Sequence, residues 1–529
     1  MSNNKKIIKK QLHEHYEILK NSHLSDLFSN AKNRGKHFTS KFHNLFIDYS
    51  KNHITDETLE LLLNYAKELD IKKSINAMFS GKEINVTEGC AVLHHALRAK
   101  PEKVLELKDN EIIKEIKDEL KNIKRFVSLV HDKKLTGWTN KPFDTYVNIG
   151  IGGSDLGTKM VVNALNQYRE EKTRSFFISN IDGEQIELLK KTINPETTLF
   201  IISSKSFKTI ETTTNADVIK SWLLKSGCDD ISKHFVAVTS NFETAKDFGI
   251  GKENIFKTWN WVGGRFSLWS AVGLPVALAI GFENFEKMLL GAYKLDEHFL
   301  SEPNEKNIPV ILALIDYWYI NFYSAPTHAI IPYDESLHYL PSYLSQLFME
   351  SNGKSTDRSG NIVSHKTGAI VWGAIGTNSQ HSVSQLLHQG KHVVPIDFLA
   401  PLMKKGDQNH HELLLANCLA QSRALMQGEN NKKSFLNFDG NKPSTTILYN
   451  ELTPETLGSL LAIYEHRVFV QGLLLEINSF DQYGVELGKK VALDISKKLA
   501  NKEKNINTDS STQNLIDIYI KSKEKNSEN

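Results

Sequence analysis

Short apolar segments alternate with helical stretches through the middle of the chain, and this alternation constrains the fold more than any other feature. Helices are expected at 156–168 and 214–224, among others. Buried apolar strands that alternate with helices are typical of a parallel sheet covered by helices on both faces. The chain is therefore expected to be an α/β protein. The strands expected in this part of the chain cover residues 146–151, 175–179, 198–203 and 235–239.

A second alternation follows in the C-terminal half. A strongly apolar helix is expected over 308–323, and a long helix over 453–475. Thr453 is the expected N-cap of the long helix, and Glu455 lies in its first turn. No internal sequence repeat links the two alternations, so any kinship between them lies in the fold alone. The strands expected here cover residues 329–332, 369–373, 392–396 and 445–449.

The two ends of the chain have a different character. The first hundred residues indicate helices over 56–69 and 91–99, and a longer amphipathic helix is expected directly after them, over 102–130. The residues after 501 are polar apart from an apolar patch at 515–520, which is a candidate helix. With 529 residues, the chain is long enough for two or three domains of about 150 residues each.

Charge and hydropathy exclude several classes of partner. A formal net charge of +2 provides no overall field that would attract nucleic acid. The most apolar stretch near the middle, residues 271–281, is about half as long as a membrane-spanning helix. The lysine-rich segment 1–12 has no long apolar stretch after it, so it does not resemble a secretory signal. We expect neither a nucleic-acid nor a membrane partner.

Cysteine and histidine spacing argues against disulfides and metal sites. The odd number of cysteines fits no closed disulfide framework, and their spacing matches no zinc module. Free thiols are typical of the reducing cytosol, so we expect a cytoplasmic protein. His388 and His392 are four residues apart, but Gly390 between them favours a helix end, and we expect no metal. The cysteines are Cys90, Cys228 and Cys418.

A glycine-rich segment, Asn148–Gly157, joins the first expected strand to a helix. Glycines let a ligand approach the backbone, and the free N–H groups at a helix N-terminus can bind an anion. Asp155 stands where a Rossmann motif has its third glycine, and Gly157-Thr158-Lys159 is not the Gly-Lys-Ser/Thr of a P-loop. The segment is therefore either a tight structural turn or a loop that binds an oxyanion or a hydroxyl group.

A hydroxyl-rich segment, Ser203–Thr209, follows the third expected strand. Hydroxyl groups at the carboxyl end of a strand that leads into a helix suit a phosphate monoester, because they donate hydrogen bonds without adding a large net charge. The alternative is an ordinary cluster of helix N-cap residues.

Three charged side chains on separate segments form a set suited to proton transfer on a sugar phosphate. Arg265 follows two glycines and can stabilise a developing oxyanion, or it forms a surface ion pair. Glu350 has apolar neighbours that suit a general base, or it is simply a glutamate at a helix end. Lys489 lies about one turn into an expected helix that follows the polar segment 478–482.

Taken together, these segments resemble the glucose-6-phosphate isomerase family, the phosphoglucose isomerases. The similarity extends over roughly residues 35–490. Its most specific stretches are Val262–Ser270 and Phe480–Lys489. Independent accidental matches in this order are not expected. Supporting matches lie at Met349–Lys354, Gly376–Gly390 and Ile149–Gly157.

The resemblance implies two αβα-sandwich domains of the sugar-isomerase (SIS) type with parallel-rich sheets. N-terminal helices and a C-terminal helical arm accompany these domains. On this basis we expect an N-terminal helical region at 1–112 that packs on the large domain, a small SIS-type domain at 113–285, a large SIS-type domain at 286–500 and a C-terminal tail at 501–529.

The resemblance also implies reversible aldose–ketose isomerisation of glucose 6-phosphate and fructose 6-phosphate, in glycolysis and gluconeogenesis, without a metal or organic cofactor. His388 and Lys489 would assist ring opening. Glu350 would move a proton between carbons 2 and 1 through a cis-enediol(ate), and Arg265 would stabilise the charge of that intermediate. The residues implied for the phosphate are Ser204, Lys205, Ser206 and Thr209, and those for the sugar are Gly153, Ser154, Gln346 and Gln482.

The family is dimeric, and the resemblance implies a homodimer in which His388 completes the site of the partner subunit. Two positions depart from the usual family pattern. Ser206 replaces a threonine but keeps the hydroxyl group, whereas Cys90 replaces an arginine and affects local packing or a salt bridge. A catalytically inactive sugar-phosphate sensor and an isomerase that also accepts mannose 6-phosphate are the alternatives. The presence of Glu350 and Lys489 favours an enzyme over a sensor.

Overall fold

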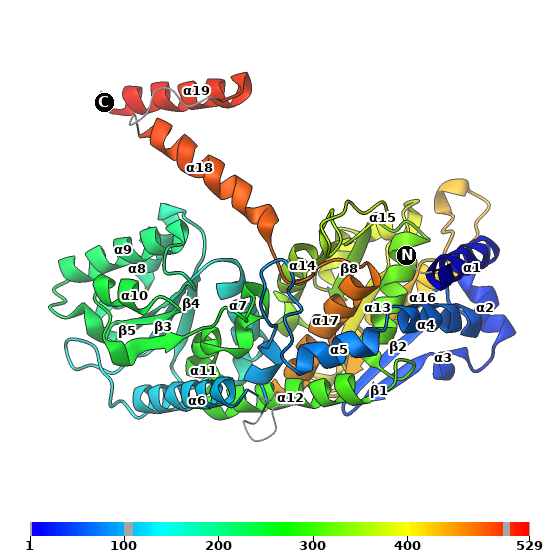
Figure 1. Ribbon diagram of the computed structural model, residues 1–529, viewed down its shortest axis with the longest axis horizontal. Helices are drawn as coiled ribbons and strands as arrows, with labels where there is room; N and C mark the ends of the chain where they lie inside the picture. The colour runs from blue at the N-terminus through cyan, green and yellow to red at the C-terminus, as the bar shows by residue number, and fades with distance from the viewer. Residues whose placement is uncertain (1–2, 100–108, 501–507, 528–529) are drawn as a thin grey trace. The chain divides into compact units, whose positions relative to one another are not determined.

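The structure is a computed structural model that describes residues 3–99, 109–500 and 508–527. It divides into two units, Met1–Phe480 and Asp481–Asn529. The larger unit contains two β-sheets with helices on both sides (Figure 1). The smaller unit contains α18 (Glu486–Leu499) and α19 (Ser510–Ser527), and α19 includes the apolar patch predicted to be helical. Residues 501–507 of the expected tail lie outside the described residues.

The first sheet has five strands, all parallel, in the order β4-β3-β5-β6-β7. The four strands predicted here are confirmed, and the central ones are buried along their whole length. The strands are β3 (Thr145–Ile149), β4 (Arg174–Ile178), β5 (Thr198–Ser203), β6 (Phe235–Thr239) and β7 (Ile255–Lys257). The connecting helices are α7 (Leu156–Ala164), α8 (Gly183–Thr192), α9 (Ile210–Lys225) and α10 (Phe242–Phe248).

The second sheet has six strands in the order β1-β2-β11-β10-β8-β9. Strands β8 to β11 are parallel, while β1 and β2 form a hairpin whose β2 pairs antiparallel with β11. The strand predicted at 392–396 is wrong in position, because Pro395 has no N–H for the ladder and the strand begins at Ile396. The strands are β1 (Thr39–Phe42), β2 (Leu45–Lys51), β8 (Thr327–Pro332), β9 (Ile370–Gly373), β10 (Ile396–Pro401) and β11 (Ser444–Tyr449).

The N-terminal region is mostly helical, as predicted, but it also supplies β1 and β2. The predicted helix at 56–69 is confirmed, with Thr55 in a capping box at its start. The helix predicted at 91–99 is wrong, because this segment is buried and forms only a 3₁₀ turn, His94–Leu97. Residues 102–108 of the helix predicted at 102–130 lie outside the described residues. The helices are α1 (Asn3–Leu19), α2 (Leu24–Asn30), α3 (Arg34–His37), α4 (Asp56–Glu68), α5 (Ile71–Phe79) and α6 (Asn110–His131).

The helix α17 (Pro454–Leu474) runs through the interior of the larger unit, and every one of its residues except Glu455 is buried. Thr453 caps its N-terminus as predicted, accepting a hydrogen bond from the backbone of Thr456. It packs against the helices α12, α13 and α14. The remaining helices of this unit are α11 (Leu274–Ile280), α12 (Phe282–Ser301), α13 (Ile308–Asn321), α14 (Leu340–Asn352), α15 (Ser384–Gln389) and α16 (Gln408–Gln427).

A cluster of buried charges joins α17 to the second sheet. Arg467 donates to Asp316 on α13 at 2.6 and 2.7 Å, and to Asp397 on β10 at 2.6 Å. His328 on β8 lies 3.1 Å from Asp397. Buried charges must be paired, because an isolated charge in a protein interior is very costly. The cluster therefore holds the helix and the sheet in one arrangement.

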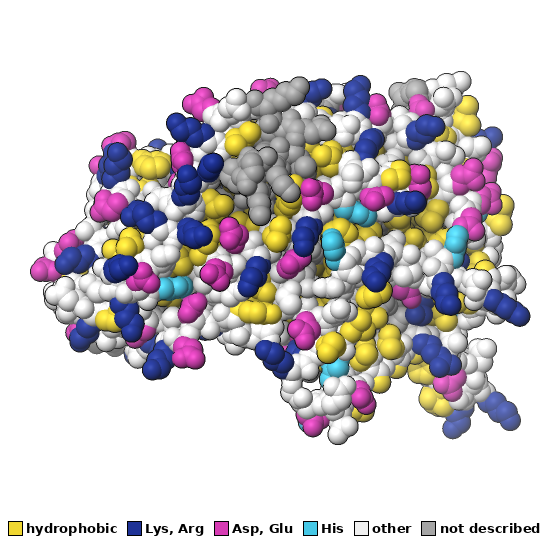
Figure 2. Space-filling view, turned by 90° about the horizontal axis from the view of Figure 1, so that it is seen from below, with side chains coloured by type: hydrophobic (Ala, Val, Ile, Leu, Met, Phe, Trp, Pro, Cys, Tyr) yellow, Lys and Arg dark blue, Asp and Glu magenta, His cyan; other side chains and the backbone are white. Residues whose placement is uncertain are grey.

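The surface drawn in Figure 2 carries basic and acidic side chains interspersed, and its described residues form no broad region of one sign. None of the helices described by the structure is long and apolar enough to cross a membrane.

Candidate active site

Two of the predicted loops meet at the carboxyl edge of the five-stranded sheet. The glycine-rich loop joins β3 to α7, and the hydroxyl-rich loop joins β5 to α9. Because β3 and β5 are parallel neighbours, and β4 lies on the other side of β3, the two loops flank the point where the strand order reverses. Ligands of open α/β sheets bind at this point. Asn148 connects the loops, since it accepts from Ser203 at 2.9 Å and donates to the carbonyl of Ser154 at 2.9 Å.

The hydroxyl-rich loop is more than a set of helix caps. Thr209 is the N-cap residue of α9, yet its side chain makes no capping bond within the described chain. It instead accepts from the buried hydroxyl of Ser204 at 3.3 Å. The hydroxyl of Ser206 accepts from the backbone N–H of Lys208 at 3.3 Å. The loop thus presents several hydroxyl groups at the start of a helix, where an anion is favoured.

Lys205 ties this loop to the segment that leads to Arg265. Its ammonium group donates to the backbone carbonyls of Asn260 and Val262 at 3.2 and 3.3 Å. Burial lowers the pKa of Lys205, and the nearby charge of Glu88 opposes that effect. The hydroxyl-rich loop and the segment at 260–269, here called the arginine loop, are therefore joined directly.

The glycine-rich loop packs tightly against the arginine loop. A Cβ atom at Gly153 would lie 2.2 Å from the carbonyl group of Gly264 and 2.7 Å from the backbone nitrogen of Arg265. Only glycine permits this approach. Next to it, Ser154 is half-buried. The close approach of these backbones brings two of the predicted motifs to one place.

Arg265 lies at the centre of the site, with only 1% of its surface exposed. Its Nη1 is 3.2 Å from Oε1 of Glu350. Its Nε donates to the hydroxyl of Ser351 at 2.6 Å, and its Nη2 donates to the carbonyl of Ser479 at 2.6 Å. The alternative of a surface ion pair is therefore wrong. The guanidinium is held in a single orientation with one edge toward the carboxylate.

Glu350 lies in the last turn of α14. Its Oε2 accepts a hydrogen bond from Gln346 at 2.8 Å, and its side chain remains 16% exposed. The other amide atom, Gln346 Oε1, is buried without a hydrogen-bond partner among the described residues. The ammonium group of Lys354 caps the helix by donating to the carbonyls of Glu350 and Ser351 at 2.8 and 2.9 Å. An unsatisfied buried oxygen beside an accessible carboxylate suits a polar ligand.

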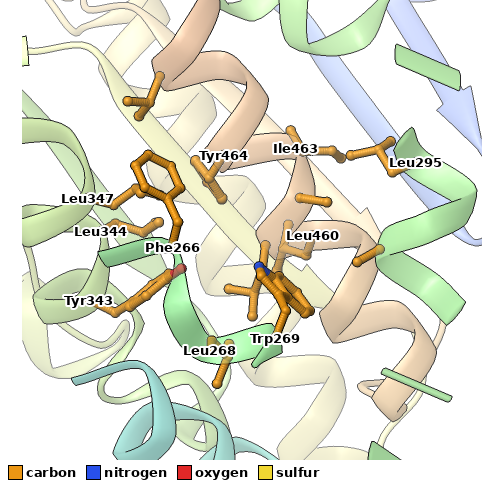
Figure 3. Close-up of a cluster of buried hydrophobic side chains, with 14 of the residues drawn as sticks. Phe266, Leu268, Trp269, Leu295, Tyr343, Leu344, Leu347, Leu460, Ile463 and Tyr464 are labelled. Atoms are coloured by element: carbon orange, nitrogen blue, oxygen red, sulfur yellow. The ribbon is translucent and has the colours of Figure 1, made fainter. Parts of the chain in front are cut away.

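The arginine loop packs on a buried apolar cluster beneath the site. The 3₁₀ segment Gly264–Trp269 buries every side chain after its glycine. Figure 3 shows Phe266, Leu268 and Trp269 among apolar side chains of α14 and α17. Trp269 Nε1 also donates to Glu465 at 2.7 Å, and burial raises the pKa of Glu465 to about 7 although the charge of Arg98 opposes this.

The two predicted ring-opening residues, His388 and Lys489, contact other residues than Arg265 and Glu350. His388 on α15 lies 2.9 Å from Oε1 of Gln421 on α16, and its ring is perpendicular to that of Phe438. Lys489 and Gln482 belong to the smaller unit. There Lys489 forms an ion pair with Glu486 at 2.9 Å and keeps a half-exposed side chain.

Three residues around Arg265 escaped the sequence analysis as contributors to the site. Ser351, Asn352 and Ser479 are almost completely buried. Ser351 and the carbonyl of Ser479 accept hydrogen bonds from the guanidinium, and Asn352 accepts one from the hydroxyl of Ser479. All three lie in segments that the motifs already included, directly after Glu350 or before Phe480. Their position next to the candidate base, or next to a matched motif, is therefore the sequence signal that could have identified them.

The described residues contain no group of three or more His, Cys, Asp or Glu side chains that could hold a metal ion. The three cysteines are free thiols, and two of them are buried.

Comparisons with known proteins place the relatives of this chain in one family. The sequence matches the family model for phosphoglucose isomerase over residues 48–516. It is 47% identical to the glucose-6-phosphate isomerase of Campylobacter jejuni subsp. doylei, over 96% of this chain and 97% of that protein. It is 46% identical to that of Christiangramia forsetii, over 97% and 98%. A crystal structure of a glucose-6-phosphate isomerase from Chlamydia trachomatis superposes with a TM-score of 0.86 at 32% identity, covering 97% of this chain and 98% of that chain.

Proposed function

The chain belongs to the phosphoglucose isomerase family, and from this membership we propose how its residues interconvert glucose 6-phosphate and fructose 6-phosphate. It is an aldose–ketose isomerase of glycolysis and gluconeogenesis. The reaction opens the sugar ring, moves a proton between carbons 2 and 1, and shifts the carbonyl group to the other carbon. The observation that carries our assignment is the contact between Arg265 and Glu350 beside the two loops of the five-stranded sheet.

Glu350 is the proposed base. A proton next to a carbonyl group is weakly acidic, so its removal needs a carboxylate within reach and a fixed positive charge for the enediolate. The carboxylate of Glu350 is partly accessible, and Gln346 holds one of its oxygens. A single carboxylate can take the proton from carbon 2 and return it to carbon 1 of the cis-enediol(ate). Positioned acid–base catalysis contributes about 10²–10⁴-fold.

Arg265 is the proposed partner of the enediolate oxygen. Its guanidinium is charged, buried and held by hydrogen bonds to Ser351, Glu350 and the carbonyl of Ser479, so it needs little reorganisation when charge develops. Preorganised donors of this kind contribute about 10²–10³ in kcat.

The phosphate is proposed to bind the hydroxyl-rich loop at the start of α9. Hydroxyl groups and the backbone N–H groups of this helix end can donate to phosphate oxygens. Binding the remote phosphate holds the sugar in place for both ring opening and proton transfer. The proposed ligands are Ser204, Lys205, Ser206 and Thr209. Gly153, Ser154, Gln346 and Gln482 are proposed to line the sugar, and the partnerless oxygen of Gln346 supports a hydroxyl partner there.

His388 and Lys489 are the proposed ring-opening residues, with His388 supplied by the partner subunit of a homodimer. Large apolar side chains support an interface near His388: Leu386 on the same helix is 48% exposed and Phe435 is 71% exposed. Gln389 links the two segments, because it donates to the carbonyl of Phe435 at 3.0 Å. Exposed apolar patches of this kind mark interaction sites.

Subunit complementation tests the shared site. Glu350→Gln and His388→Asn homodimers are each expected to be inactive. A hybrid dimer contains one site in which both residues are intact, so mixing with subunit exchange restores activity. Hybrids that form but remain inactive would show that His388 serves its own chain.

The domain arrangement is also proposed on the family's pattern. An N-terminal region at 1–112, SIS-type domains at 113–285 and 286–500, and a tail at 501–529 would place one sheet in each α/β domain, with β1 and β2 joining the second. A cytoplasmic location is proposed from the free thiols, since disulfides are rare in that compartment.

The direct test is the formation of fructose 6-phosphate from glucose 6-phosphate by the purified protein in EDTA. We expect rapid conversion, because a base and a fixed cation provide the chemistry without a metal. Binding of the sugar phosphate without conversion would instead identify a sensor. Conversion that EDTA abolishes would overturn the proposed roles of Glu350 and Arg265.

A further inference from the structure

A chain of buried hydrogen bonds begins at the guanidinium of Arg265 and leads into α17. Nη2 of the arginine donates to the backbone carbonyl of Ser479 at 2.6 Å. The hydroxyl of Ser479 donates to Oδ1 of Asn352 at 2.6 Å. Asn352 Nδ2 donates to Gln471 at 2.7 Å, and Gln471 donates to Asp316 at 3.3 Å. The arginine is thus connected to the charge cluster that joins α17 to the second sheet.

All the hydrogen-bonding groups of the Asn352 amide are occupied within this chain. Its Nδ2 donates to Gln471 and also to the carbonyl of Val468 at 3.0 Å, while Oδ1 accepts from Ser479. Because a carbonyl can only accept, Nδ2 must face α17 and Oδ1 must face the serine. The side chain is completely buried, so leaving any of these groups without its partner carries the full desolvation cost. Asn352 therefore has one orientation, and it dictates that of Ser479.

The backbone of α17 packs closely against the serine. A Cβ atom at Gly472 of α17 would lie 1.8 Å from the Ser479 hydroxyl and 3.1 Å from Oδ1 of Asn352. The helix backbone therefore closes over the hydrogen bond between the two side chains. On the other side of the guanidinium, Ser351 accepts from Nε at 2.6 Å. The turn of α14 that carries Glu350 thus also carries the two residues that hold the arginine, one directly and one through Ser479.

We propose that Asn352 and Ser479 are positioning residues of the isomerisation, which align Arg265 with Glu350 without contacting the sugar. This inference rests on the roles proposed for Arg265 and Glu350. The single amide orientation fixes the serine, the serine carbonyl fixes Nη2, and the guanidinium edge then faces the carboxylate. A guanidinium released from this restraint keeps its charge but is no longer aligned with Glu350. We therefore expect a lower kcat and little change in KM.

Ser479→Ala is the informative variant, because it removes the hydroxyl group and keeps the carbonyl that contacts Arg265. We expect kcat to fall about tenfold, with KM changed by less than about twofold. Asn352→Ala serves as a second variant with the same expected pattern. Ser459→Ala is the matched control, since it removes a buried serine hydroxyl of α17 that donates to Gly291 at 2.8 Å, and we expect it to keep wild-type kcat. Thermal unfolding verifies that every variant is folded.

A double-mutant cycle separates positioning from a general structural role. In an Arg265→Lys background there is no guanidinium to align, so Ser479→Ala should lower kcat by less than about twofold. The same tenfold loss in both backgrounds, or an unchanged kcat for Ser479→Ala alone, would overturn the proposal. Wild-type kcat for Arg265→Lys alone would instead remove the proposed role of Arg265 itself, and the positioning role with it.

Discussion

Replacement of Glu350 by glutamine tests the proposed base with little disturbance of the fold. The amide has the shape of the carboxylate but cannot accept the proton from carbon 2. In the structure, Oε1 faces Arg265 and Oε2 faces the amide nitrogen of Gln346. A glutamine at 350 can keep its oxygen toward the arginine and turn its nitrogen toward Gln346. Because Oε1 of Gln346 has no hydrogen-bond partner in the described part of the chain, its amide can rotate and accept that new N–H.

The magnitudes follow from these contacts. The variant exchanges a charge-assisted contact at 3.2 Å for a neutral one and regains a hydrogen bond at Gln346, so the free energy of unfolding should fall by about 1 kcal/mol or less. Loss of a general base removes about 10²–10⁴-fold in rate, which corresponds to about 3–5 kcal/mol of transition-state stabilisation. Binding of the sugar phosphate should persist, since the hydroxyl-rich loop is untouched.

The assay compares turnover with binding. Conversion of fructose 6-phosphate is followed with glucose-6-phosphate dehydrogenase as the coupling enzyme, and substrate binding to the same variant by calorimetry. Glu350→Asp is the matched control: it keeps a carboxylate but withdraws it by one methylene, and a misplacement of about 1 Å is expected to cost about 10²-fold. Glu350→Gln turnover above about a tenth of wild type would refute the assignment of Glu350 as the base.

Three further outcomes are expected. Ser204→Ala combined with Thr209→Ala should raise KM about tenfold or more with a smaller change in kcat, and an unchanged KM would remove both from the phosphate site. Burial alone would lower the pKa of His328, but the charge of Asp397, together with hydrogen bonds to Asp316 and Asp397, raises it to about 9 from 6.5. The contribution of protonated His328 to the free energy of unfolding, about 3 kcal/mol, is therefore complete below pH 6.5 and lost as the pH rises through about 9. Denaturant unfolding at both ends of this range should show that loss, and His328→Gln should reduce it; equal pH dependence of both proteins would contradict the reasoning. Arg98→Met removes the cation that is paired with the buried carboxylates of Asp296 and Glu465 and should cost about 3–5 kcal/mol of unfolding free energy, whereas an unchanged thermal midpoint would show that these ion pairs are not needed.

Local patterns predicted the first sheet better than the second. The strands β5 and β6 are continuous apolar runs, and burial on both faces makes such runs easy to recognise. The hairpin β1–β2 contains many polar residues and was missed, because its place in the sheet depends on pairing with β11 almost 400 positions away. The 91–99 segment has an apolar pattern that suits a helix, but tertiary burial between other elements leaves it only a short 3₁₀ turn.

The residue types of the candidate site could be predicted from the sequence, but the contacts between them could not. The loops after β3 and β5 can be recognised in the sequence by their residue types and by their position after buried strands. The approach of Arg265 to Glu350 joins positions 85 residues apart and depends on how α14 and the arginine loop pack, which no local pattern encodes. The same holds for Ser479, whose carbonyl acts through backbone position and not through residue type.

The central claim, proton transfer by a carboxylate through an enediolate, is tested most directly with glucose 6-phosphate labelled with deuterium at carbon 2. The reaction is run in ordinary water with EDTA, and the label at carbon 1 of fructose 6-phosphate is followed by NMR over many turnovers. A proton held on Glu350 can exchange with solvent, so the account predicts that the label is transferred in part and progressively lost. Complete retention of deuterium at carbon 1 after many turnovers would indicate a direct hydride shift and contradict the account.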